Sequence, residues 1–102
     1  MTHGPALSDE ELSIVAAILR DNLPVNVTVH VFGSRAKGRV KAWSDLDLVF
    51  EGPAPLPLSL TAALAEAFEE SDLPWKVDIV DRKTVSDDFG KLIDQTKIAL
   101  SS

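Results

Sequence analysis

Residues 45–51 read Asp-Leu-Asp-Leu-Val-Phe-Glu, a run in which two aspartates alternate with apolar residues. In a β-strand, side chains two positions apart point to the same face, so Asp45 and Asp47 would lie side by side. The opposite face would carry Leu46, Leu48 and Phe50. Strand interiors are depleted in Asp, and like charges held close repel unless something positive neutralises them. This segment therefore predicts a half-buried strand whose second face serves a divalent cation, or an edge strand with two solvated carboxylates.

Two further patterns precede this strand. Ser8 and Glu11 match a capping box, and the apolar residues behind them recur at helical spacing, which predicts a helix that ends near Asn22 before Pro24. Valines alternate with polar residues over 25–31, which predicts a strand that Gly33 ends. The short basic segment 34–41 favours one or two helical turns.

The second half continues the alternation. Apolar residues at helical spacing predict a helix over 60–68, and the run 75–81 predicts a third strand. Thr84 or Ser86 can cap a last helix that contains Gly90. Helices that alternate with strands indicate an α/β fold, a small mixed β-sheet with helices packed on it. We expect one domain over residues 1–102, with 1–6 flexible and an extra edge strand or a partner supporting the thin sheet.

Composition narrows the function. The formal net charge of −6 argues against strong direct nucleic-acid binding by the whole surface. The chain has no cysteine, no basic head followed by an apolar stretch and no run of about 20 apolar residues, so we expect a cytoplasmic protein without a membrane segment. The basic cluster Arg35, Lys37, Arg39 and Lys41 is either a solvated turn or a contact for polyphosphate.

Asp78 lies within the apolar run Val77–Val80, where a carboxylate is costly unless it is paired or binds a metal. If this strand neighbours the first aspartate strand, Asp78 completes a three-carboxylate site, and Mg²⁺ is the ion that such oxygens suit. Asp81 is a rival, but its position at the strand end beside Arg82 favours a surface role. His30, His3, Trp43 and Trp75 fit structural roles better than ligand roles.

Gly33 and Ser34 end the first strand, where a glycine lets backbone approach a ligand and a following helical turn can face an anion. Gly33-Ser34, then residues 35–44, then Asp45-Leu46-Asp47, with Asp78 on a later strand, is a specific arrangement. It resembles the catalytic pattern of the nucleotidyltransferase superfamily related to DNA polymerase β. The stretch 32–50, FGSRAKGRVKAWSDLDLVF, resembles the minimal nucleotidyltransferase branch, and the likeness covers nearly the whole chain.

The resemblance implies a nucleotidyltransferase fold and a role for each motif residue. Gly33, Ser34 and Arg35 would bind the nucleotide, with Arg35 on a phosphate. Asp45, Asp47 and Asp78 would be catalytic and hold two Mg²⁺ ions, and Asp78 would also position or deprotonate the attacking hydroxyl.

Members of this branch are commonly antitoxins, so the resemblance also implies a partner. The implied reaction transfers AMP from ATP to a tyrosine of a cognate HEPN toxin. A non-catalytic module that neutralises a partner by contact is the alternative, compatible with apolar residues such as Leu56 and Leu58. An aspartate-nucleophile phosphatase fits less well, because Leu48, Val49 and Phe50 continue the strand after the aspartate pair.

Overall fold

The computed structural model describes residues 7–33, 35–36 and 45–100. Within them, four strands form one sheet in the order β3-β2-β1-β4. The elements are α1 (Asp9–Asn22), β1 (Thr28–Phe32), β2 (Leu46–Glu51), α2 (Leu58–Glu69), β3 (Val77–Asp81), α3 (Asp87–Thr96) and β4 (Ile98–Ala99). Strand β1 is antiparallel to β2 and β4, whereas β2 and β3 are parallel, so the mixed sheet that the sequence predicts is confirmed.

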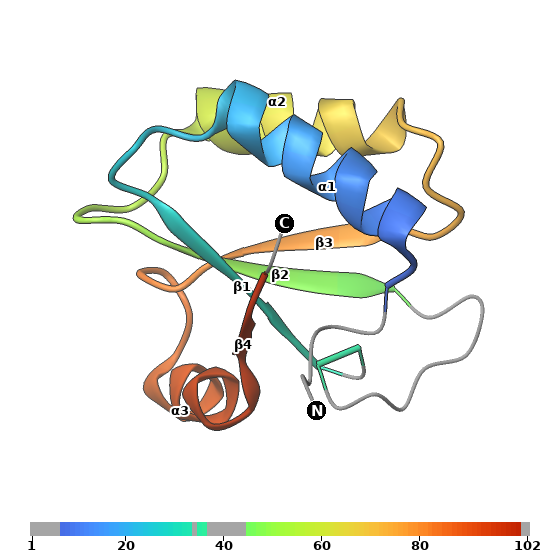
Figure 1. The fold of residues 1–102 in the computed structure, drawn as a ribbon. Coiled ribbons are helices and arrows are strands. Elements are labelled where there is room, and N and C mark those ends of the chain that lie inside the picture. The colour runs from blue at the N-terminus through green and yellow to red at the C-terminus, as the bar shows by residue number, and fades with distance from the viewer. Residues whose placement is uncertain (1–6, 34, 37–44, 101–102) are drawn as a thin grey trace.

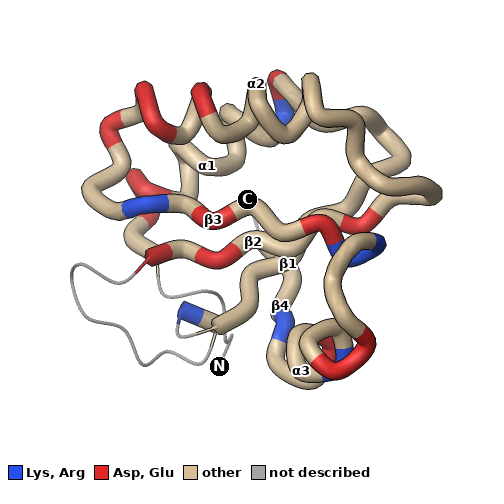
Figure 2. The backbone as a smooth tube through the Cα atoms, turned by 180° about the vertical axis from the view of Figure 1, so that it is seen from behind, with Lys and Arg blue, Asp and Glu red and all other residues tan. Residues whose placement is uncertain are grey.

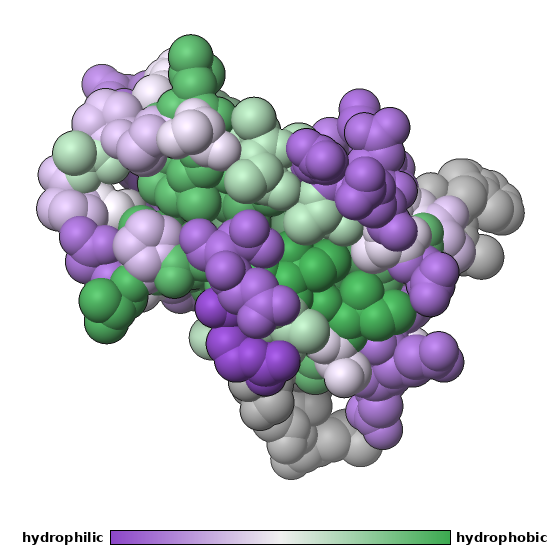
Figure 3. All heavy atoms as spheres, turned by 90° about the horizontal axis from the view of Figure 1, so that it is seen from above, coloured by the Kyte–Doolittle hydropathy of each residue, from purple (hydrophilic) through white to green (hydrophobic). Residues whose placement is uncertain are grey.

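Helices α1 and α2 lie side by side on one face of this sheet (Figure 1). The buried side chains of Leu46, Leu48 and Phe50 point toward them, as the period-two pattern predicts, and none of the three is accessible to solvent. Burying a side chain of this size stabilises the fold by about 1.5–3 kcal/mol. The outer surface over these helices shows hydrophobic side chains between hydrophilic ones (Figure 3). No described helix is both long enough and apolar enough to cross a membrane.

Helix α3 packs on the other face of the sheet, against a second apolar cluster that contains Phe32, Val49 and Ile93. Ser86, one of the two caps that the sequence allows, accepts the Phe89 N–H at 3.3 Å and begins the helix. Gly90 is buried inside α3. A Cβ there would lie 2.5 Å from the Arg82 guanidinium, so only a glycine lets Arg82 pack against the helix at this position. In Figure 1, α3 lies below one end of the sheet, and β2 and β3 both begin at the other end.

The starts of three predicted strands are corrected. Strand β1 begins at Thr28, later than the predicted residue 25, because the Val27 N–H donates to the Pro24 carbonyl and closes a turn in which Val25 is fully exposed. Strands β2 and β3 begin at Leu46 and Val77 and not at the predicted residues 45 and 75, so Asp45 lies just before β2. The extra edge strand expected for the thin sheet is β4, which pairs with β1 through Ile98 and Ala99. A two-residue strand has no periodicity that a sequence could display. The predicted turns over 34–41 and the flexible end 1–6 fall outside the described residues, except that residues 35–36 form a turn.

Asp81 anchors the proline-rich loop before α2. Its carboxylate accepts the Leu56 N–H at 2.8 Å and the Lys83 N–H at 2.9 Å. Leu56 is consequently half-buried against the core, whereas Leu58 remains 87% exposed. Asp81 therefore has a structural function in holding two loops together, and of the two leucines expected at the surface only Leu58 is exposed.

We expect Asp81→Ala to lower the free energy of unfolding by about 2 kcal/mol, because two backbone N–H groups lose a charged acceptor. Denaturant unfolding monitored by circular dichroism measures the change. Asp72→Ala is the matched control, since Asp72 is exposed in the connection after α2, and it should shift stability by less than about 0.5 kcal/mol. Equal losses in the two variants would contradict the anchoring role.

Candidate active site

The parallel register of β2 and β3 places Asp47 directly opposite Asp78. Both residues alternate with core residues that face α1 and α2, so their carboxylates share the opposite face of the sheet. Figure 2 shows acidic segments of β2 and β3 next to each other on the sheet. The three-carboxylate prediction required that these two strands be neighbours, and they are. Two of its three carboxylates, those of Asp47 and Asp78, lie together.

Gly33 brings backbone against Asp47. The glycine follows β1 with φ of 77°, a left-handed conformation that residues with a Cβ rarely adopt. A Cβ at this position would overlap Asp47 Oδ2, so any other residue would push the carboxylate away. The end of β1 and the beginning of β2 therefore form a close junction at which a ligand can meet both backbone and carboxylate.

Asp47 lies in surroundings that favour its protonated form. Burial, a side-chain hydrogen bond with Asp78 and the charges of Asp78 and Asp45 together raise the pKa of Asp47 from its ordinary 3.8 to about 6. The carboxylate is therefore charged but unfavourably placed at neutral pH, and a bound cation could neutralise that charge.

Two basic residues lie near the candidate carboxylates. The Lys76 ammonium is 3.6 Å from Asp78 Oδ1, in an exposed contact that adds little stability. Arg35 interacts electrostatically with Asp45, which is exposed just before β2. Sequence reasoning missed Lys76, although its position two residues before Asp78 on a strand already placed both on one face.

Arg35 is the buried charged residue of this region, with 4% of its surface exposed. Its guanidinium carbon lies 4.2 Å from the centroid of the Trp75 ring, a cation–π contact. Burial lowers the pKa of Arg35, and the nearby Glu11 and Asp45 carboxylates oppose that change. The residue expected on a phosphate is therefore packed against the core in this structure.

The donor set suits Mg²⁺ in its chemistry. Carboxylate oxygens are the ligands that this ion prefers, and it is usually held by one or two of them together with substrate phosphates. Among the residues that the structure describes, no group of three or more His, Cys, Asp or Glu side chains is arranged as a metal site. The carboxylate oxygens of Asp47 and Asp78, with those of Asp45 nearby, could hold the ion together with phosphate oxygens of a bound nucleotide.

The other residues considered in the sequence analysis lie away from the carboxylate pair or outside the residues that the structure describes. Ser34, Lys37, Arg39, Lys41, Trp43 and His3 lie outside the described residues. His30 lies in β1 opposite Val49 and Ala99, and its buried Nδ1 has no partner among the described residues.

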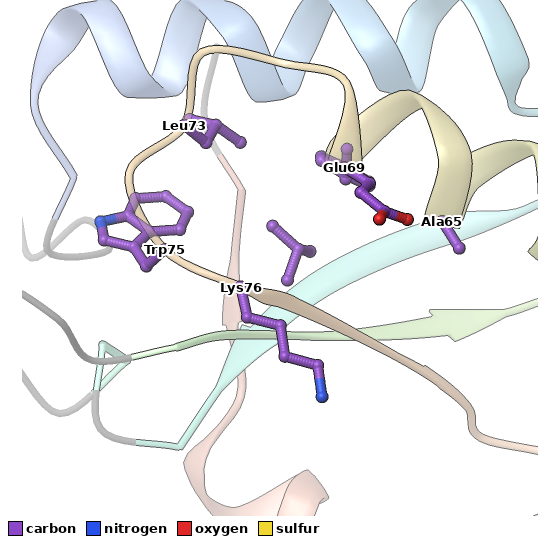
Figure 4. Close-up of a pocket in the computed structure, with 7 residues that line it drawn as sticks. Ala65, Glu69, Leu73, Trp75 and Lys76 are labelled. Carbon is purple, nitrogen blue, oxygen red and sulfur yellow. The ribbon is translucent and has the colours of Figure 1, made fainter.

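A pocket of about 460 Å³ lies between α2 and the start of β3. Trp75 and Leu73 border one side, Ala65 and Glu69 of α2 border the other, and the Lys76 side chain extends away from Trp75 (Figure 4). None of the three candidate aspartates lines this pocket. The candidate active site is therefore the carboxylate pair beside Gly33 and not this apolar hollow.

Comparison with known proteins agrees with this geometry. The family model for the nucleotidyltransferase domain matches residues 12–100. This chain belongs to the nucleotidyltransferase family. A Haemophilus influenzae protein named "Probable protein adenylyltransferase MntA" is 45% identical over 94 residues, which cover 92% of this chain and 82% of that protein.

Solved structures share the fold of this nucleotidyltransferase. A chain of a toxin–antitoxin complex with AMP-PNP superposes with a TM-score of 0.72 at 25% identity, over 89% of this chain and 73% of that one. A chain from a complex of a tri-AMPylated Shewanella oneidensis HEPN toxin with an MNT antitoxin gives a TM-score of 0.64 at 22% identity, over 89% and 69%. The fold and the enzyme class expected from the motifs are thus confirmed.

Asp47→Asn should stabilise the nucleotidyltransferase at pH 7.5 relative to wild type, because it removes a repelled charge and keeps a hydrogen-bonding side chain. The sign follows from the raised pKa of Asp47, which moves from 3.8 to about 6 on folding. The folded protein then holds more protons than the unfolded chain between these values, so this contribution is complete below pH 3.8 and is lost as pH rises to about 6.

Denaturant unfolding of both proteins between pH 4 and pH 8 measures this effect. The advantage of Asp47→Asn over wild type should grow from pH 4 to about 6 and then level off. Asp72→Asn, an exposed aspartate in the connection after α2, serves as the control and should show no such trend. A difference that is constant across this range would contradict the raised pKa of Asp47.

Proposed function

We propose that this nucleotidyltransferase transfers AMP from ATP to a hydroxyl group, with Asp45, Asp47 and Asp78 as its catalytic carboxylates. The observation that carries the proposal is the Asp47–Asp78 pair, two carboxyl groups in register on adjacent strands and adjoining Gly33. Stability alone does not favour such a pair, because the like charges repel at neutral pH. Paired carboxylates retained at that cost are typical of a functional site.

Asp45, Asp47 and Asp78 would hold two Mg²⁺ ions, which when bound neutralise charge on the triphosphate and on the leaving pyrophosphate. The triphosphate would lie along Gly33 and Ser34, where the lack of a Cβ lets the Gly33 backbone come close to the Asp47 carboxylate. Phosphoryl transfer depends chiefly on positioning and charge neutralisation; the glycine turn would supply the positioning, and the metal ions held by the carboxylates would supply the neutralising charge.

In the proposed reaction, the acceptor oxygen forms a bond to the α-phosphorus of ATP. The bond from that phosphorus to the bridging oxygen breaks, and pyrophosphate leaves with the bonding electrons. Asp78 orients the acceptor hydroxyl and takes up its proton. Asp78 is the more accessible candidate for this step, since its side chain is 40% exposed and lies in β3 at the edge of the sheet.

The proposed acceptor is a tyrosine of a cognate HEPN-type toxin, which makes the chain an antitoxin of the cytoplasm. The name of the Haemophilus influenzae relative, a protein adenylyltransferase, supports modification of a protein. The toxin–antitoxin complexes of the same fold, one with AMP-PNP and one with a tri-AMPylated toxin, support ATP as donor and a toxin as acceptor.

We expect Asp47→Asn and Asp78→Asn each to reduce AMP transfer at least about 100-fold, a loss of the size seen when one group that stabilises the reacting charges is removed. Purified chain, cognate toxin, Mg²⁺ and labelled ATP are incubated, and label on the toxin is counted. Asp72→Asn is the control and should transfer at the wild-type rate, because Asp72 lies outside the site.

The alternative function, neutralisation by contact alone, predicts a different result in the same assay. Wild type would place no label on the toxin, and Asp47→Asn would still suppress the toxin's activity as well as wild type does. Exposed Leu58, at the start of α2, is compatible with such a contact. Label that requires Asp47 excludes this alternative.

Mg²⁺ and ATP together should raise the melting temperature of wild type and leave Asp47→Asn nearly unchanged. A ligand at about 100 times its Kd stabilises the folded state by roughly 2.7 kcal/mol. Differential scanning fluorimetry with EDTA, Mg²⁺ alone, ATP alone and both measures the effect. A full shift with ATP in EDTA would show that the nucleotide binds without the ion, against the proposed metal-dependent site.

A further inference from the structure

Arg35 is buried to a degree that arginine seldom reaches. Only 4% of its surface is exposed, and arginines are almost never fully buried unless they are paired. An arginine that binds phosphate presents its N–H donors to the space where the phosphate arrives. Arg35 lies over the Trp75 ring, 4.2 Å from the ring centroid, so the aromatic side chain covers one face of the guanidinium and little of the residue remains open to an incoming ligand.

Among the residues that the structure describes, three separate segments lie near Arg35. Glu11, in the first turn of α1, and Asp45, just before β2, both act on its charge. Trp75, in the connection to β3, supplies the aromatic face and is itself 91% buried, with 9% of its surface exposed. The turn that follows Gly33 is therefore held to a helix and to the starts of both strands that carry the candidate carboxylates.

We infer that Arg35 is a positioning residue, which anchors the turn after Gly33 to Trp75 and thereby keeps Gly33 against Asp47. This role replaces the phosphate contact that the family resemblance implied, and it rests on the proposed nucleotide transfer. Arg35 then acts on the reaction through the geometry of the turn and not through a bond to the substrate.

The physical connection runs through short links. The Lys76 carbonyl, next to Trp75, accepts the Leu46 N–H at 2.9 Å, which fixes Trp75 relative to the start of β2. Asp47 follows Leu46, and its Oδ2 is the atom that Gly33 approaches. Figure 4 shows the Trp75 ring beside the pocket under α2 and the Lys76 side chain directed away from that ring.

A double-mutant cycle tests the inference. Arg35→Met removes the charge and keeps the length of the side chain, and Trp75→Leu removes the ring. We expect each single variant to lower kcat/KM for ATP by about tenfold or more, the range of a desolvated cation–π contact. The kcat/KM of the double variant should then lie within about twofold of that of the less active single variant, because both changes remove the same contact.

Arg20→Met is the matched control, since Arg20 is an exposed arginine in the last turn of α1, and it should leave kcat/KM unchanged. Conservative changes provide a rescue. Trp75→Phe keeps an aromatic face and should retain most activity, and it replaces Trp75→Leu in the cycle if that variant melts below the assay temperature. With Phe, a coupling of about threefold is expected, because Phe gives the weaker cation–π contact.

Two results would overturn the positioning role. Independent effects, with the losses of the single variants multiplying in the double variant, would mean that Arg35 does not act through Trp75. Loss of ATP affinity in Arg35→Met with normal affinity in Trp75→Leu, measured by isothermal titration calorimetry, would return Arg35 to a phosphate contact. If wild type binds ATP but transfers no AMP, the proposed function is wrong. The double-mutant cycle can then be measured on ATP affinity, and it still tests whether Arg35 acts through Trp75.

Discussion

The parallel pairing of β2 with β3 is the constraint on which the rest of the molecule depends. It sets Asp47 opposite Asp78 on one face of the sheet, and on the other face it aligns the buried Leu48 with Ile79 under the two helices. A slip of one residue would turn the leucines outward and the aspartates into the core. The apolar face therefore fixes the register, and the register assembles the acidic pair. Core packing and chemistry are set by the same alternation.

The two ends of this sheet have different tasks. The end at which β2 and β3 begin holds the candidate carboxylates, a glycine in a left-handed conformation and the buried Arg35. Burial and repulsion between the carboxylates lower the stability of the fold there. Where the same strands finish, Asp81 accepts two backbone N–H groups and Arg82 pairs with Asp94 at 3.0 Å. Aspartates of similar appearance in the sequence thus differ in role according to what surrounds them. Those beside other carboxylates suit a ligand, whereas the one that accepts N–H groups suits the fold.

The sequence predicted the features that local rules govern. The capping box at Ser8 and Glu11, the helix start at Ser86 and the alternating faces of β2 each depend on residues a few positions apart, and each is confirmed. The meeting of Asp47 with Asp78 could be proposed only on the condition that their strands were neighbours, because periodicity gives a face but not a register. The pairing of β4 with β1 and the stacking of Arg35 on Trp75 bring together residues that are far apart in the sequence, so no local pattern predicts them.

The raised pKa of Asp47 links the stability of the fold to the proposed function. Burial first, then the hydrogen bond with Asp78 and the neighbouring carboxylate charges, raise this pKa to about 6, so the free site carries an unfavourable charge at neutral pH. A divalent cation brought in with a triphosphate would neutralise that charge. In the proposed function the free site is therefore unfavourable at neutral pH, and a bound metal ion would remove that cost. Arg35 is a nearby cation, but it is buried over Trp75, and the carboxylates that act on its charge are Glu11 and Asp45. The proposal accordingly assigns Asp47 and Asp78 to the metal-bound nucleotide and not to a permanent ion pair with Arg35.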